Sequence, residues 1–502
     1  MSATASSSRG TESSGVPRHL WPIILVVVLG MIMSVLDTTI VNVALNDLSI
    51  DLHASLDDIQ WVVTGYLLSL AAVIPVTGWA ANRFNMKKLY ISSIVLFTAG
   101  SVLCALSWSS ETLIFARVIQ GIGGGMLTPV GQMILVKASG PRNLPRVMSA
   151  IGVPIVLAPI FGPTLGGLLL EHAGWQWIFL INLPVGIIAV IAALRLLPST
   201  VGSRERAGTL DVIGLGLVAT GLVGVTYGLA QSGAAGSLID SSVLIPFFIG
   251  IVLITIFVLR ALRITRPLLD IRLYLNKAFA AASVTTFCLG AALFGAMILM
   301  PLYFQEVRGE DPVHTGLMLI PQGVGAAVAM GMSGRFTERF GGGLTALVGG
   351  LITVAATVPF VLIGAHTPYI VLAVAMVVRG FGIGMSMMPA MTAAFSVLRP
   401  DQVNHATPQL TVVQRVGGSV GTAIMSVVLG SKIADAGAAP SSGALADAFG
   451  STYIIVLVVT IIALLPTILL SVVERRARAE RVTAPRASAP AEPVAVLEAE
   501  PV

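Results

Sequence analysis

The stretch that decides the fold is Trp21 to Leu45, WPIILVVVLGMIMSVLDTTIVNVAL, which is long enough to cross a bilayer yet carries one acid, Asp37. An ionised carboxylate at that depth costs about 2.5 to 3.5 kcal/mol on insertion scales, so it normally faces a wet cavity, pairs with a cation or holds a proton. Each of these states indicates transport. The alternative is that Asp37 lies near the outer end of the helix and reaches surface water.

Polar side chains continue from Asp37 along the same helix. Thr38, Thr39 and Asn42 follow it at helical spacing. At about 1.5 Å per residue, Asp37 lies about 25 Å along the axis from Leu20, in the outer third of the hydrocarbon core. A polar stripe at this depth predicts a cavity beside the helix.

The composition is that of a polytopic membrane protein. Of the 502 residues, 55% are hydrophobic and 11% are charged, and the mean hydropathy is +0.92. Cys104 and Cys288 both lie in apolar runs, so we expect small core residues and no disulfide framework. The polar segment 1–19 precedes an apolar run without a cleavage site, so we expect the first span to be retained.

Apolar runs of spanning length recur along the chain. We expect fourteen, at 20–44, 59–79, 88–108, 112–136, 147–170, 175–197, 211–232, 242–263, 278–302, 314–334, 344–364, 368–394, 407–430 and 451–473. With the N-terminus inside, 24 of the 29 Lys and Arg residues fall in inner segments. This alternation predicts a multi-pass protein of the cell (inner or plasma) membrane with both termini cytoplasmic.

Three motifs are repeated at a near-constant offset. They are GWAANRF at 78–84 with GRFTERF at 334–340, the Arg- and Gly-rich run from 117 with that from 379, and the glycines at 162 and 166 with those at 417 and 421. The repeat predicts an all-α protein whose two six-helix bundles meet around a site near the membrane midplane and rock about it.

The domain boundaries follow from the spans and the repeat. The expected order is a disordered cytoplasmic N-terminus at 1–19, an N-terminal bundle at 20–197, two inserted helices at 211–263, a C-terminal bundle at 278–473, and a tail at 474–502. The tail is first basic and then rich in Ala, Pro and Glu, which predicts a membrane-surface anchor followed by a disordered cytoplasmic end.

Arg117 requires a partner. An isolated arginine inside a span costs several kcal/mol, and Asp37 is the one acid within the predicted spans of the N-terminal bundle. We therefore expect the pair Asp37–Arg117. A proton on Asp37 would upset the charge balance of the pair and bias the equilibrium between inward and outward states.

Four motifs point to one family. They are LDTTIVNVAL at 36–45, RVIQGIG at 117–123, the Gly- and Pro-rich run at 152–167, and WIFLINLPVG at 177–186. Over nearly the whole chain, these motifs resemble the major facilitator superfamily, and more narrowly its fourteen-span drug:proton antiporter family. The resemblance implies that Asp37 and Arg117 act in proton coupling.

The third of these motifs is similar to the antiporter signature. Gly162 and Gly166 permit close approach of another backbone, while Pro159 and Pro163 bend the helix. The resemblance implies that this helix seals the interface between the bundles in the outward-closed state. The alternative is a generic packing face of small residues.

The loop after the second span resembles the signature loop of the superfamily. It carries Gly78 and Arg83, but Asn82 stands where the family has an aspartate. Asparagine accepts a hydrogen bond but adds no charge to the helix dipole, so the charge relay of the family's gating loop is in question here. A second departure lies in the first span, where Asn46 stands at the position at which the family's motif usually ends in proline.

Polar and aromatic residues of several spans are candidates for a substrate cavity. They are Asn42, Trp61, Tyr66, Gln120, Gln305, Gln322, Arg379 and Arg415. Leu293 occupies the place of Asp37 in the repeat, so the two cations of the C-terminal bundle have no acid at similar depth. Anionic, zwitterionic or neutral lipophilic substrates therefore fit at least as well as dications. The alternative is that Arg415 caps carbonyls and Arg379 fixes its span.

Several classes of function are disfavoured. The chain has no Gly-Lys dipeptide and hence no phosphate-binding loop for ATP, no His-Glu-x-x-His and no Gly-x-Ser-x-Gly. We expect a transporter without enzymatic activity, bound metal or cofactor, and without a nucleic-acid partner. Its expected partners are lipophilic substrates, protons and the bilayer, and the need for a periplasmic adaptor protein is open.

Three functions are compatible with these features. The first is export of lipophilic drugs or toxic small molecules by proton antiport, the second a proton-coupled exporter dedicated to one endogenous metabolite or lipid precursor, and the third a non-transporting sensor or channel. The coupling pair, the antiporter signature and the repeat argue against the third. We expect Asp37→Asn to leave the protein folded and membrane-inserted while abolishing gradient-driven accumulation.

Overall fold

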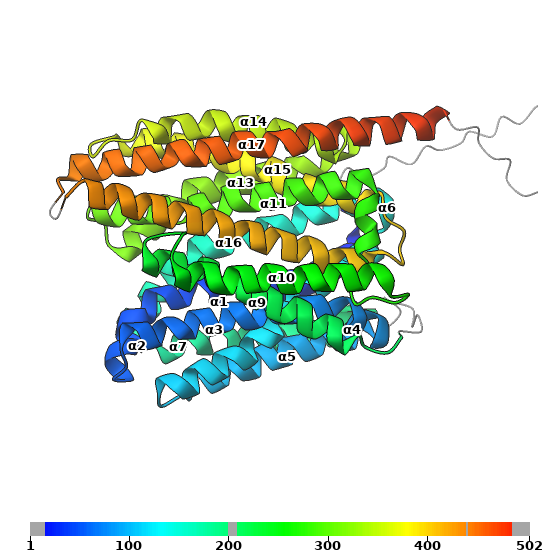
Figure 1. Cartoon of the computed structure of the whole chain (residues 1–502), viewed down its shortest axis with the longest axis horizontal. Helices are drawn as coiled ribbons and strands as arrows, with labels where there is room; N and C mark the ends of the chain where they lie inside the picture. Colours follow the sequence, from blue (N-terminus) through cyan, green and yellow to red (C-terminus); the bar gives the residue numbers. More distant parts are fainter. Residues whose placement is uncertain (1–15, 199–207, 438–439, 484–502) are drawn as a thin grey trace, which may run out of the picture.

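The computed structural model describes residues 16–198, 208–437 and 440–483, without the side chains at 56, 154–156, 159, 160, 234 and 477–483. The described residues form helices and contain no strand. Thirteen of these helices are long and apolar enough to cross a membrane. The helices lie roughly parallel in two tiers, with the early part of the chain in one and the late part in the other (Figure 1). The protein is an all-α polytopic membrane protein, as its composition predicts.

The helices follow the order of the predicted spans. The α-helices are α1 Trp21–Ile40, α2 Leu45–Asp51, α3 Leu56–Val73, α4 Thr77–Arg83, α5 Met86–Ala105, α6 Ser110–Ala173, α7 Gln176–Leu180, α8 Asn182–Leu196, α9 Val212–Ala235, α10 Ser241–Arg263, α11 Lys277–Met297, α12 Leu299–Leu302, α13 Pro312–Phe340, α14 Gly342–Val361, α15 Tyr369–Ser396, α16 Val403–Asp435 and α17 Ser442–Thr483. Short turns continue several spans, namely η1 Arg18–Leu20, η2 Val41–Ala44, η3 Ile74–Val76, η4 Ile271–Leu275 and the π-helical η5 Tyr303–Val307.

Helix α6 contains both the fourth and the fifth predicted spans. It is interrupted at Gly140, whose φ of 65° and ψ of 171° are non-helical and favour glycine. On either side of this glycine, Arg117 and Gly162 both lie beside the same turn of α1. In a straight helix these two positions would be about 70 Å apart, so the chain folds back at Gly140. The count of fourteen spans remains a prediction. The thirteen helices found include α6 once, although α6 contains two of the predicted spans.

The repeat in the sequence has a counterpart in the packing. A Cβ at Gly162 would overlap the Thr39 hydroxyl of α1, and one at Gly417 would overlap the Phe287 carbonyl of α11. Similarly, Gly78 of α4 packs on Asn404 at the start of α16, while Gly334 of α13 packs on residue 146 in α6. Equivalent glycines therefore make equivalent close contacts in the two parts of the chain, as expected where backbones approach closely.

The inserted helices α9 and α10 lie along one side of the junction between the two tiers (Figure 1). Helix α9 contacts α3 and α16 as well as α10. Ala71 of α3, Leu222 of α9, Phe257 of α10 and Val416 of α16 belong to one hydrophobic cluster. On its other face α10 exposes apolar side chains such as Ile245 and Phe248, as a lipid-facing helix does.

The predicted terminal segments fall mostly outside the described residues. These are 1–15 of the expected disordered N-terminus and 484–502 of the expected disordered tail. The basic beginning of the tail continues α17, which is helical to Thr483 and runs past the end of the bundle (Figure 1). Within it, the buried Glu474 carboxylate accepts hydrogen bonds from the amides of Gly342 and Gly343, the first two residues of α14.

Candidate functional site

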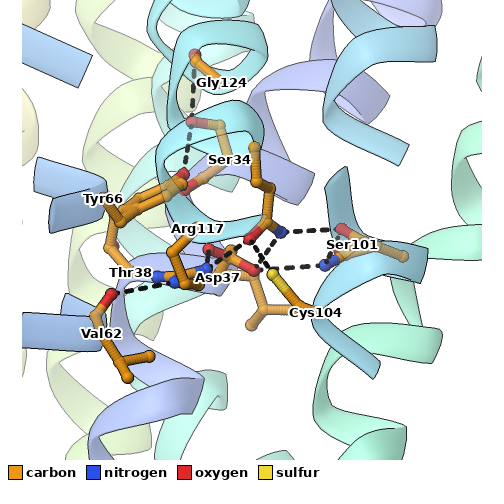
Figure 2. A network of polar contacts seen from close by, with 12 residues as sticks. Ser34, Asp37, Thr38, Val62, Tyr66, Ser101, Cys104, Arg117 and Gly124 are labelled. Atoms are coloured by element: carbon orange, nitrogen blue, oxygen red, sulfur yellow. Dashed lines mark hydrogen bonds and ion pairs between the residues drawn. The ribbon is translucent and has the colours of Figure 1, made fainter. Parts of the chain in front are cut away.

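Asp37 and Arg117 form a buried ion pair in the N-terminal part of the chain. The Nη1 of Arg117 lies 2.5 Å from the Oδ2 of Asp37, and the side chains of Arg117 and Asp37 are 1% and 0% exposed, respectively. Figure 2 shows the two side chains within a network of polar contacts. The expected pairing is therefore present. Asp37 does not reach surface water, so the alternative that placed it there is wrong.

Two side-chain amides complete the surroundings of the Asp37 carboxylate. The Nε2 of Gln120 donates to its Oδ1 at 2.8 Å, and the Nδ2 of Asn182 donates to the same oxygen at 3.3 Å. Both amide groups also donate to the hydroxyl of Ser101, at 2.7 and 3.3 Å. The network thus joins α1, α5, α6 and α8.

Arg117 has further partners that hold its guanidinium in place. Its Nε donates to the Val62 carbonyl at 3.1 Å, and its Nη1 also donates to Oε1 of Gln120 at 2.6 Å. The guanidinium carbon lies 4.0 Å from the centre of the Tyr66 ring, a cation–π contact. The Tyr66 hydroxyl in turn donates to the Ser34 carbonyl at 3.2 Å (Figure 2).

This arrangement suits an ionised carboxylate. Each of the three polar groups within hydrogen-bond distance of Asp37, on Arg117, Gln120 and Asn182, donates to it. A proton on Asp37 would occupy one acceptor position and remove the charge that compensates Arg117. Such a change of charge would take place in a low-dielectric interior, where electrostatic interactions are strong.

Three residues of this network were missed by the search for cavity residues. Ser34, Ser101 and Asn182 are each buried and lie in different helices. Each is one polar residue in an apolar run, which is a weak signal that is shared with many structural serines. Asn182 stands within the motif at 177–186 and was the most accessible of the three to sequence reasoning.

The predicted cavity residues are spread over several places. Gln120 is fully buried in the network around Asp37, where its amide is engaged. Trp61 is 42% exposed and stacks on Tyr227 of α9 at 5.5 Å. Asn42 is exposed one turn beyond Asp37, Gln305 is exposed in η5, and Gln322 is buried in α13.

The remaining two cations lie in the C-terminal part of the chain. Arg379 is 2% exposed, whereas Arg415 of α16 is half-buried. Arg415 interacts electrostatically with Tyr66, which belongs to the other part of the chain. Tyr66 therefore interacts with Arg117 of its own part of the chain and with Arg415 of the other part. The roles of Arg379 and Arg415 in substrate binding remain predictions.

The end of the molecule that contains residues 78–88 and 334–342 will be called the basic end. Here the Nδ2 of Asn404 donates to the side-chain Oδ1 of Asn82, and the buried Gly78 packs on Asn404, while Arg83 is exposed. At the repeat-related contact, Nε of Arg146 lies 2.7 Å from Oε1 of Glu338. The first contact is uncharged and the second is an ion pair, so the charge absent at 82 is present in the second copy of the motif.

The antiporter-like run packs between both parts of the chain. Gly162 and Gly166 face Thr39 and Ile40 of α1, and Thr164 beside the half-buried Pro163 packs on Gly316 of α13. The side chain of Pro159 lies outside the described residues. The predicted close approach at the two glycines is confirmed, and a role in sealing the interface stays a prediction.

A family model for the Major Facilitator Superfamily matches residues 27–422. A curated relative, the "Multidrug resistance protein B homolog" of Mycobacterium tuberculosis, is 41% identical over 410 residues, covering 80% of this chain and 75% of the relative. The "Methylenomycin A resistance protein" of Bacillus subtilis is 33% identical over 431 residues, covering 86% and 91%.

A solved structure shows the same fold. The human organic anion transporter MFSD10 superposes with a TM-score of 0.59 at 15% identity, covering 90% of this chain and all of that one. Together with the multi-pass helical architecture, these matches identify a membrane transporter. The chain belongs to the major facilitator superfamily.

Proposed function

We propose that the protein exports lipophilic drugs or toxic small molecules in exchange for protons by alternating access. The observation that carries the proposal is the buried Asp37–Arg117 pair, because an ionisable pair inside a membrane span normally serves a function such as proton transfer. The drug-resistance names of two relatives support the substrate class. The arrangement of the lysines and arginines in the loops supports a cell-membrane location with the basic end and both termini in the cytoplasm.

Protonation of Asp37 is the proposed coupling step. Breaking a buried ion pair by neutralising one partner costs about 3 to 5 kcal/mol, because the other charge stays buried. A conformation in which Arg117 gains water or another acceptor would then be favoured. The route to the other bundle is short, since Thr39 packs on Gly162 and Thr164 two residues later packs on Gly316 of α13.

The contacts at the basic end support alternating access. Arg146–Glu338, Ser149–Ser333 at 2.8 Å and Asn82–Asn404 all join the two parts of the chain, and all must separate if this end opens. The side chains of the ion pair are 27% and 26% exposed. Such a partly exposed pair contributes about 1 kcal/mol or less, so this ion pair by itself is only a small obstacle to opening.

The charges at the junction bear on the substrate. Asp37 is compensated by Arg117, whereas Arg415 is half-buried and approaches Tyr66 from the other bundle. An anionic, zwitterionic or neutral lipophilic compound avoids the repulsion that a dication would meet there. Asn42, Trp61 and Gln322 are further proposed contacts.

The test is transport by purified protein in liposomes with an imposed pH gradient. A panel of cationic, neutral and anionic compounds is presented, and we expect movement of several dissimilar compounds with counterflow of protons. Movement of one compound alone would establish the dedicated exporter instead. Asp37→Asn should abolish uphill accumulation, and Asp401→Asn, in the exposed pair with Arg399, should not. Full uphill transport by Asp37→Asn would refute the proton site.

A further inference from the structure

Arg379 is a buried cation without a hydrogen-bond or ion-pair partner among the described residues. It is 2% exposed in the middle of α15, and it makes no hydrogen bond or ion pair within the part of the chain that the structure describes. An arginine stays protonated in proteins, and an uncompensated charge in the membrane interior costs several kcal/mol. An acceptor from outside the chain would remove much of this cost.

The guanidinium lines a small cavity inside the C-terminal bundle. The cavity has a volume of about 20 Å³ and lies between α11, α14, α15 and α17, with Leu289, Leu293 and Leu464 among its apolar lining residues. A volume of about 10 to 15 Å³ is enough for one water molecule, whereas drug-sized ligands need about 300 Å³ or more. A monatomic species fits this space and a drug does not.

The other polar groups around the cavity do not compensate the charge. The hydroxyls of Thr353, Ser386 and Thr460 donate to carbonyls of their own helices, at 2.9, 2.9 and 2.7 Å. No acid of the described residues lines the cavity. The buried Tyr453 hydroxyl, which interacts electrostatically with Arg379, likewise has no hydrogen-bond partner among the described groups. The side chains of Arg379 and Tyr453 are thus two buried hydrogen-bond donors that interact electrostatically with each other and lack an acceptor among the described groups.

The internal repeat explains the origin of this cavity. Arg379 and Leu293 correspond to Arg117 and Asp37 of the first bundle. In the first bundle the carboxylate of Asp37 neutralises the arginine, while in the second Leu293 lines the cavity beside it. The second bundle therefore contains the arginine and a small cavity beside it, but no carboxylate at the position that corresponds to Asp37.

We propose that this cavity is a binding site for one monatomic anion of the size of chloride or bromide, held by Arg379. A water molecule would supply an acceptor, but an anion also neutralises the charge in a low-dielectric interior. The walls exclude polyatomic anions by size, so sulfate and gluconate should not substitute. The site lies inside the C-terminal bundle and is independent of proton exchange at Asp37.

The site is tested by chloride binding to purified protein. We expect saturable uptake of radioactive chloride at about one ion per chain, and a thermal midpoint that rises with chloride or bromide at constant ionic strength but not with sulfate or gluconate. Arg379→Gln should weaken chloride binding at least tenfold. Arg415→Gln is the matched control, because it removes another interior cation, and it should retain the chloride site.

A second variant tests the inference even if Arg379→Gln folds poorly. Leu293→Asp places a carboxylate where the repeat has Asp37, so it should raise the thermal midpoint in gluconate and abolish the chloride effect. The proposal is overturned by an absence of saturable binding, by equal binding in Arg379→Gln, by loss of binding in Arg415→Gln, or by an unchanged chloride effect in Leu293→Asp. An ordered water at Arg379 in a crystal grown in bromide would overturn it as well.

Discussion

The ion pair between Asp37 and Arg117 allows a quantitative test by a double-mutant cycle. The variants are Asp37→Asn, Arg117→Met and their combination. Asp37→Asn leaves the Arg117 charge buried with the Val62 carbonyl, Gln120 Oε1 and the Tyr66 ring as its partners. Arg117→Met leaves the Asp37 carboxylate with the amides of Gln120 and Asn182.

The structure sets the magnitudes. Each single substitution leaves one uncompensated charge at a site that is at most 1% exposed, so each should lower the free energy of unfolding by about 3 to 5 kcal/mol. The double variant removes both charges and should cost less than the sum of the two by about 3 kcal/mol. For Asp37→Asn we expect the lower end of the range, because the cation–π contact with Tyr66 persists.

The assay is equilibrium unfolding in mixed detergent micelles, followed by circular dichroism, with size-exclusion profiles to verify folding. Asp401→Asn is the matched control, since the same change at the exposed Arg399–Asp401 pair should leave the unfolding midpoint within error of the parent. Additive losses in the double variant, or a stability of Asp37→Asn equal to that of the parent, would falsify the claim that each charge depends on the other. Neither the singles nor the double should accumulate substrate uphill.

Two further predictions concern packing and closure. Gly162→Ala should destabilise by about 1 to 3 kcal/mol in the same assay, because its methyl group overlaps the Thr39 hydroxyl; Thr39→Ala should recover part of the loss, and Gly216→Ala, with no atom within 4 Å of its Cβ, should not destabilise. Glu338→Gln should favour opening of the basic end by about 1 kcal/mol, seen as an about fivefold faster thiol labelling of a cysteine placed at Ser333 in a cysteine-free background. Unchanged labelling would mean that Arg146–Glu338 does not hold this end closed.

The sequence predicted the ion pair for a reason that the structure makes plain. A single acid and a single arginine inside the spans of one bundle have few other charged groups with which to pair. The free-energy cost of burying either charge alone favours a contact between the two. The close contacts of Gly162 and Gly166 were predictable as well, since glycine spacing along a helix specifies where a neighbour approaches. Both predictions followed from the chemistry of the residues themselves, namely the cost of an unpaired buried charge and the close approach that glycine permits.

Other features depend on how distant segments are placed. Ser101 and Asn182 are ordinary polar residues in apolar helices. Asn182 donates to both Asp37 and Ser101 because α1, α5 and α8 pack together. Gln120 was assigned to the cavity because of its polarity, but its neighbours on α1 and α5 direct it to Asp37. The pairing of residues 146 and 338 spans 192 positions and requires the arrangement of the two bundles.

The position of α9 has a consequence for compounds dissolved in the bilayer. Helix α9 contacts both α3 and α16, and Trp61 of α3 stacks on its Tyr227. Along this seam a hydrophobic molecule diffusing sideways through the acyl chains meets a helix before it meets the junction of the bundles. On this side of the molecule α9 therefore hinders direct entry of a compound from the lipid into the junction. If the two bundles move relative to each other, α9 must slide along α3 or along α16.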